Sequence, residues 1–117
     1  MTTAKIGDLD VTLAAPASMA ARYDVLLGSE RNRQRAMAAA LGLCWQRGDG
    51  RPKAKYSYDV MAYGGAVIDE LGARGVKLRD VLAAGGIALE LCAEGLFSES
   101  EVAEAVGNSE AGGDPAP

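Results

Sequence analysis

The chain has 117 residues and a formal net charge of −4, and it contains no histidine. This length fits a single domain. The lack of histidine excludes histidine-activated nucleophiles and most zinc sites. The N-terminal residues have no apolar signal core, and no apolar run approaches the ~18–20 residues of a membrane span. We therefore expect a cytoplasmic protein that does not contact a membrane.

The composition favours a small helical domain. Apolar residues make up 49% of the chain and aromatic residues 5%, so alanine, leucine, valine, methionine and glycine must build the core. The patterns described below predict a mainly α fold, a bundle of four to five helices with a short N-terminal β-strand or hairpin and a disordered C-terminal tail. The corresponding segments are an extended or strand segment over 1–15, a helical domain over 16–107 and a disordered tail over 108–117.

The N-terminal part contains one clear strand pattern and one ambiguous segment. Residues 8–13 alternate between polar and apolar side chains, which predicts a half-buried strand. A lone strand needs a partner, which could be a hairpin, residues 23–27 or another chain. Residues 17–27 fit a strand or a helix, and their alanines favour a helix whose apolar face is Met19, Tyr23, Leu26 and Leu27.

Three helices are predicted in the middle of the chain. Ser29 is a suitable cap for a helix over 30–46, and the glycines and proline of 48–55 predict a loop. Ser57 is expected to open a second helix that ends near Gly72 and Gly75. Apolar residues three and four apart predict a third helix over 78–94.

A further helix is predicted after Phe97. Residues 98–101 have the sequence SESE, which is a capping box, and Phe97 can pack against Val102 as a hydrophobic staple. This helix should end at residues 107–108. The tail from Ser109 contains no large apolar residue, so it is expected to be disordered.

Two glycine pairs interrupt predicted helices. Each glycine costs a helix about 1 kcal/mol relative to alanine. The pairs are therefore expected to allow a close helix crossing or, alternatively, to form a hinge used in assembly. They are Gly64 with Gly65, and Gly85 with Gly86.

The charge is divided along the sequence. Residues 1–79 contain all 12 basic residues and 8 acidic ones, a net charge of +4, whereas residues 80–117 contain 8 acidic residues and no base. Two solvated faces of one fold, a head-to-tail contact between copies and nucleic-acid binding all fit this division. Nucleic acid is the least favoured, because no recognition motif accompanies the bases. The candidate interaction surface is Arg31, Arg33, Arg35, Arg47, Arg51, Lys53 and Lys55.

No residue pattern indicates catalysis, a metal or a cofactor. Glu90 and Glu94 share a helix face, but solvated acidic faces are far commoner than metal sites. Tyrosines and lysines lie close together over 53–63, without a dinucleotide-binding pattern beside them. Cys44 and Cys92 each lie in an apolar helical stretch, which indicates buried free thiols. We expect a protein that is not an enzyme.

Several runs resemble a known class of protein. They are SERNRQRA at 29–36, AAALGLCW at 38–45, RPK at 51–53, YDV at 58–60, YG at 63–64 and DEL at 69–71. Over residues 22–97 the chain resembles the small helical proteins of tailed-bacteriophage structural gene clusters, most of all those that look like tail assembly chaperones.

The resemblance implies a non-enzymatic role in virion assembly. The partner would be a phage structural protein or further copies of the chain, in the host cytoplasm or on the virion. The alternative is a small phage-encoded regulatory or inhibitory protein that binds a host factor through charge complementarity.

Overall fold

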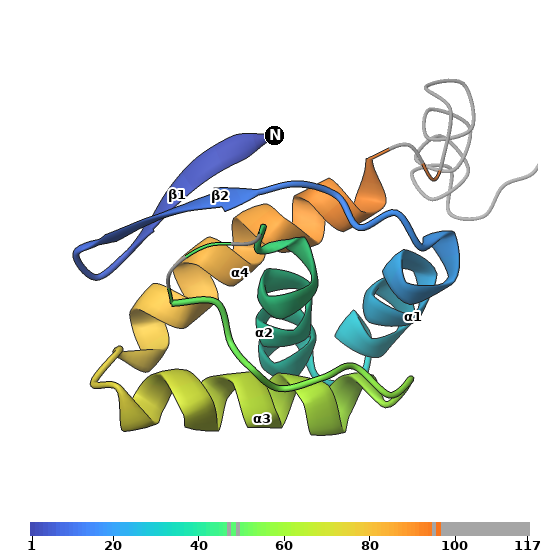
Figure 1. The fold of residues 1–117 in the computed structure, drawn as a ribbon. Coiled ribbons are helices and arrows are strands. Elements are labelled where there is room, and N and C mark those ends of the chain that lie inside the picture. Colours follow the sequence, from blue (N-terminus) through green and yellow to red (C-terminus); the bar gives the residue numbers. More distant parts are fainter. Residues whose placement is uncertain (47, 49, 95, 97–117) are drawn as a thin grey trace, which may run out of the picture.

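A computed structural model describes residues 1–46, 48, 50–94 and 96. Two strands precede four helices in this part of the chain: β1 (Thr2–Ile6), β2 (Leu9–Leu13), α1 (Met19–Ser29), α2 (Arg33–Cys44), α3 (Val60–Ala73) and α4 (Leu78–Ala93). Figure 1 shows α2 at the centre, with α1, α3 and α4 around it and the hairpin lying along α4. The prediction of a mainly α fold with an N-terminal hairpin is confirmed. The fifth predicted helix, over 98–107, and the predicted tail lie outside the described residues.

The two strands form an antiparallel hairpin. Thr2 pairs with Leu13 and Ile6 with Leu9, and Gly7 adopts a φ of +62° in the tight turn between them. One side of the hairpin is buried against the helices and comprises Ala4, Ile6, Val11 and Leu13. The partner of the predicted strand is therefore the segment just before it.

Helix α1 ends two residues later than predicted, and its end shows that the predicted cap of α2 is wrong. Ser18 caps α1 by accepting a hydrogen bond from the Ala21 amide (3.1 Å), and α1 continues through Ser29. The Ser29 hydroxyl donates to the Leu26 carbonyl (2.6 Å), so this side chain bonds backward and does not cap. The cap of α2 is Asn32, whose extended backbone lets its side chain accept from the Arg35 amide.

Glycines allow both neighbours of α2 to approach its backbone. A Cβ atom at Gly64 of α3 would overlap the Arg35 carbonyl group of α2, and one at Gly85 of α4 would lie 2.7 Å from the Met37 carbonyl oxygen. On its own side α2 contributes small buried side chains, namely Ala36, Ala38, Ala39 and Ala40. Small side chains therefore form this part of the core, and the helix axes lie close together.

The ends of α3 differ slightly from the prediction. Asp59, and not Ser57, is the N-cap, and its side chain accepts a hydrogen bond from the Ala62 amide (3.0 Å). The chain turns after α3 at Gly75, whose φ is +85°. Helix α4 then runs one residue shorter than predicted. In the described part of the chain, no helix is long and apolar enough to cross a membrane.

Candidate protein interface on helix α1

Helix α1 turns its largest apolar side chains toward solvent. Met19, Tyr23 and Leu27, here called the α1 stripe, are 49%, 51% and 47% exposed. Their spacing of four residues places them along one face of the helix. The residues that α1 buries are Ala21, Arg22 and Val25. The prediction that Met19, Tyr23 and Leu27 face the core is therefore wrong, and Leu26 is only partly buried.

Arg22 explains why α1 is turned this way. The side chain is 8% exposed, and its Nε donates to the Cys92 carbonyl near the end of α4 (3.1 Å). Carbonyl groups in the last turn of a helix lack helical partners and carry partial negative charge, so a buried guanidinium is stabilised there. Its Nη1 also contacts the Met19 sulfur (3.3 Å). Because Arg22 must reach α4, the opposite side of α1 faces outward.

Tyr58 extends this apolar surface beyond α1. It is 78% exposed and has a φ of +67°, a backbone conformation that is costly for a residue with a side chain. Its ring centroid lies 5.4 Å from that of Tyr56, which in turn lies 5.5 Å from that of Tyr63. The Tyr56 hydroxyl donates to Asp24 of α1 (3.2 Å). This contact fastens the tyrosine segment to α1.

A groove of about 360 Å³ joins the α1 stripe to Tyr58. Leu27 lies on one side of it, and Tyr58 and Met61 lie on the other. Its polar residues are Asp24, Arg31 and Asp59. The groove is therefore lined by both apolar and charged side chains, as protein-binding surfaces are.

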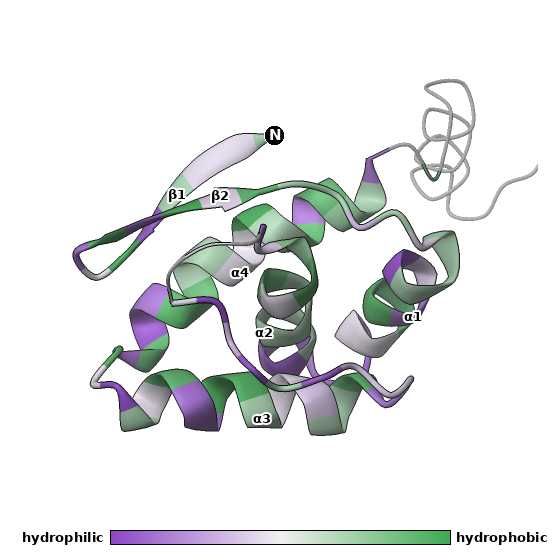
Figure 2. Ribbon diagram, in the orientation of Figure 1, coloured by the Kyte–Doolittle hydropathy of each residue, from purple (hydrophilic) through white to green (hydrophobic). Residues whose placement is uncertain are grey.

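The basic residues predicted as an interaction surface do not form one cluster. Arg31, Arg33 and Arg35 are exposed around the start of α2, a turn coloured hydrophilic in Figure 2. Arg31 lines the groove beside Tyr58, Arg33 lines a second groove between α1 and α4, and the Arg35 guanidinium lies over Gly65. These residues therefore lie on different sides of the α2 start.

The remaining basic residues belong to the segment between α2 and α3. Arg51, Lys53 and Lys55 are exposed and line a groove with Leu43 and Tyr63. Arg47 lies outside the described residues. Within the described part of the chain, ion pairs join Lys5 to Asp10, Glu70 to Arg74 and Arg79 to Asp80. None of these pairs joins residues 31–55 to the acidic residues of α4.

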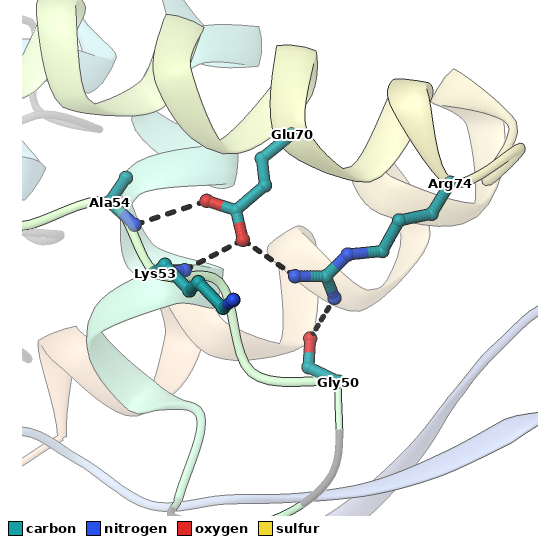
Figure 3. Close-up of polar contacts among 5 residues, drawn as sticks. All are labelled: Gly50, Lys53, Ala54, Glu70 and Arg74. Atoms are coloured by element: carbon teal, nitrogen blue, oxygen red, sulfur yellow. Dashed lines mark hydrogen bonds and ion pairs between the residues drawn. The ribbon is translucent and has the colours of Figure 1, made fainter.

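Glu70 holds the segment between α2 and α3 in place (Figure 3). Its carboxylate accepts from the amides of Lys53 (2.7 Å) and Ala54 (3.1 Å) and from Arg74 Nη2 (2.6 Å). Arg74 also donates to the Gly50 carbonyl. These hydrogen bonds, chiefly the one from the Lys53 amide, lower the pKa of Glu70. Glu70 thus fixes the backbone that displays Lys53 and Lys55.

The second glycine of each pair has a looser environment than the first. A Cβ atom at Gly65 would lie 3.7 Å from the Arg35 guanidinium, and one at Gly86 would lie 3.5 Å from Met37 Cε. Both neighbouring atoms are at the ends of flexible side chains. Gly64 and Gly85 therefore mark the helix crossings, whereas Gly65 and Gly86 lie beside them.

Comparison with known proteins gives no assignment: no family model, no curated protein and no solved structure matches the chain. Among the residues that the structure describes, no three histidine, cysteine, aspartate or glutamate side chains are grouped as a metal site would require. The α1 stripe with Tyr58 and Arg31 is the candidate functional site. Sequence reasoning found the residues of the stripe but predicted the opposite orientation, although Ala21 and Val25 form an alternative buried face four residues apart.

Proposed function

We propose that this chain is a non-enzymatic assembly protein that acts through protein–protein contacts, in the manner of the phage virion-assembly proteins that its sequence resembles. The observation that supports this proposal is the outward orientation of the α1 stripe. Met19, Tyr23 and Leu27 are about half exposed on one helix face. Apolar surface displayed in this way on a small protein is typical of a binding site.

The exposed apolar area is too small for a whole interface, so charged residues around it would have to contribute. With roughly 200 Å² for a fully exposed side chain of this size, the α1 stripe and Tyr58 can bury about 450 Å². A standard interface buries about 800 Å² on each partner. The apolar residues would therefore form the centre of the interface, and the neighbouring arginines would supply the rim.

We propose that the partner is a second copy of the chain, because its acidic half has a charge complementary to that of Arg31. Residues 80–117 contain eight acidic residues and no base, whereas Arg31 lies in the groove beside Leu27 and Tyr58. Contact between the α1 stripe of one copy and the acidic C-terminal end of α4 in the next, where Glu90 and Glu94 are exposed, is heterologous. Such contacts build rings or filaments, which suits a protein of virion assembly.

The test compares two leucines of equal exposure. Leu27 on α1 is 47% exposed and Leu78 on α4 is 46% exposed. Because fully burying a leucine contributes about 1.5–3 kcal/mol and about half of Leu27 remains to be buried, Leu27→Ser should weaken self-association about threefold to tenfold in sedimentation experiments. Leu78→Ser should leave it unchanged, because Leu78 begins α4 and Glu90 and Glu94 lie at the other end of that helix. A chain that remains monomeric at about 0.1 mM, or equal effects of the two variants, would contradict the proposal.

The charged rim has its own test. Raising the salt concentration from about 0.05 to 0.5 M should weaken self-association, because it screens exposed charges. Arg31→Gln should weaken association at low salt and reduce its salt dependence, whereas Arg79→Gln, at the end of α4 opposite Glu90 and Glu94, should not. If the chain is monomeric but binds another acidic virion protein through Leu27, the proposed binding surface is correct and the proposed partner, a second copy, is wrong.

A further inference from the structure

Two thiols meet in the core at the ends of α2 and α4. Cys44 is the last residue of α2, and Cys92 lies in the last turn of α4. Both side chains are fully buried, and their Sγ atoms are 3.7 Å apart. This distance corresponds to sulfur atoms in contact and is longer than a disulfide bond of about 2.05 Å. To form the bond, the two sulfurs would have to approach by about a further 1.7 Å.

The surroundings of the two thiols differ. The one S–H of Cys44 can donate either to the Ala88 carbonyl oxygen (3.5 Å) or to the Cys92 sulfur. Arg22 is buried next to Cys92 and donates to its carbonyl group (3.1 Å). The hydrogen bond from Cys44, together with the positive charge of Arg22, lowers the pKa of Cys92. The same bond and burial raise the pKa of Cys44. Cys92 is therefore the thiol that ionises first.

We propose that Cys44 and Cys92 form a modification site, at which a peroxide converts the two thiols into an internal disulfide that joins α2 to α4. These are the chain's two cysteines, so an internal bond has one possible pairing. The two cysteines are 48 positions apart in sequence, and the segment between them includes the whole of α3. The bond would fasten both ends of this segment and the end of α4 that holds Arg22.

The chemistry is balanced with hydrogen peroxide as the oxidant. The Cys92 thiolate attacks one peroxide oxygen, the O–O bond breaks, and the departing hydroxide takes up a proton to become water. Cys92 is then a sulfenic acid. The Cys44 sulfur attacks the Cys92 sulfur, the S–O bond breaks, and the thiol proton leaves with the hydroxyl group as a second water. The two thiols lose two electrons, which reduce the peroxide. A small oxidant is required because the pair is buried and is reached through local opening of the fold.

The experiment treats the intact, folded chain with hydrogen peroxide and follows its mass and thiol content. The expected product has lost the mass of two hydrogen atoms and contains no thiol after denaturation. It migrates as a monomer without reductant, and dithiothreitol restores both thiols. Peptide mapping should recover Cys44 joined to Cys92. The oxidised chain should also unfold at a higher urea concentration than the reduced chain, because the bond restricts the unfolded state.

Two single variants test the order of the reaction. In Cys44→Ala, dimedone should trap a sulfenic acid at Cys92. In Cys92→Ala, Cys44 should react with peroxide more slowly than Cys92 does in the other variant, because Arg22 is bonded to Cys92 and not to Cys44. Should a variant fail to fold, the mass measurement on the wild-type chain decides alone. Thiols that persist after treatment, separate oxidation of each cysteine to a sulfinic acid, or disulfide-linked dimers would each overturn the proposal.

Discussion

Gly64→Ala is the substitution for which the structure gives the sharpest prediction. The added methyl group would overlap the carbonyl group of Arg35, which belongs to the backbone of α2. Backbone atoms cannot move aside as a side chain can, so α3 would have to shift away from α2. Overpacking of this kind typically costs about 1–3 kcal/mol. The gain in helix propensity on replacing glycine, about 1 kcal/mol, opposes this cost.

Gly65→Ala is the matched control in the same helix. There the new methyl group would lie 3.7 Å from the Arg35 guanidinium, an ordinary contact with a flexible side chain. This variant keeps the full propensity gain and should be more stable than the wild-type chain by up to about 1 kcal/mol. The two variants should therefore differ by about 1–3 kcal/mol, although both replace glycine with alanine in adjacent positions.

The assay is urea unfolding followed by far-ultraviolet circular dichroism. Gly64→Ala should lower the midpoint and Gly65→Ala should raise it, with the same slope for both. The difference corresponds to about 4 °C in melting temperature per kcal/mol for a chain of this size. Gly85→Ala and Gly86→Ala provide a second matched pair in α4, against the backbone and side chain of Met37. Equal stability within both pairs would refute the reasoning that these glycines allow close helix packing.

Three further predictions concern polar contacts. Arg22→Met should cost about 1–3 kcal/mol in urea unfolding, because the buried Cys92 carbonyl loses its donor, whereas exposed Arg79→Met should change stability by less than about 0.5 kcal/mol. The pKa of Glu70 is lowered, so its contribution to stability is present above the ordinary value of 4.5 and is lost as the pH falls through the lowered value. Glu70→Gln should remove this part of the pH dependence of the urea midpoint, and an unchanged profile would contradict it. Burial and the neighbouring Asp24 raise the pKa of Tyr56 to about 12, so Asp24→Asn should lower the alkaline pH at which ultraviolet absorbance reports its ionisation.

Helix positions were easier to predict than helix ends. Apolar spacing located α3 and α4, because their buried residues, such as Val67 and Leu71 or Leu89 and Cys92, recur every three to four positions. The N-caps of α2 and α3 were harder to predict, since more than one suitable residue preceded each helix. Asn32 and Asp59 cap the helices where Ser29 and Ser57 were predicted. Tertiary packing fixes where α3 begins, because Val60 at its start lies against Gly28 of α1.

The candidate site was predicted least well. Hydrophobicity suggested that Met19, Tyr23 and Leu27 face the core, yet they are about half exposed. A periodic pattern identifies a helix face but does not establish what covers it. Here the bond between Arg22 and Cys92, 70 positions apart, fixes the rotation of α1. Sequence spacing contains no information about a contact over that distance.

The sequence alone determined that the chain is mainly helical, that it begins with a strand and that its charge changes sign after Arg79. These properties follow from local periodicity and composition. The tertiary structure decided which glycines lie at helix crossings, which side of α1 faces solvent and that Cys44 meets Cys92. Each of these depends on atoms from distant segments, and their positions are fixed by packing of the whole chain.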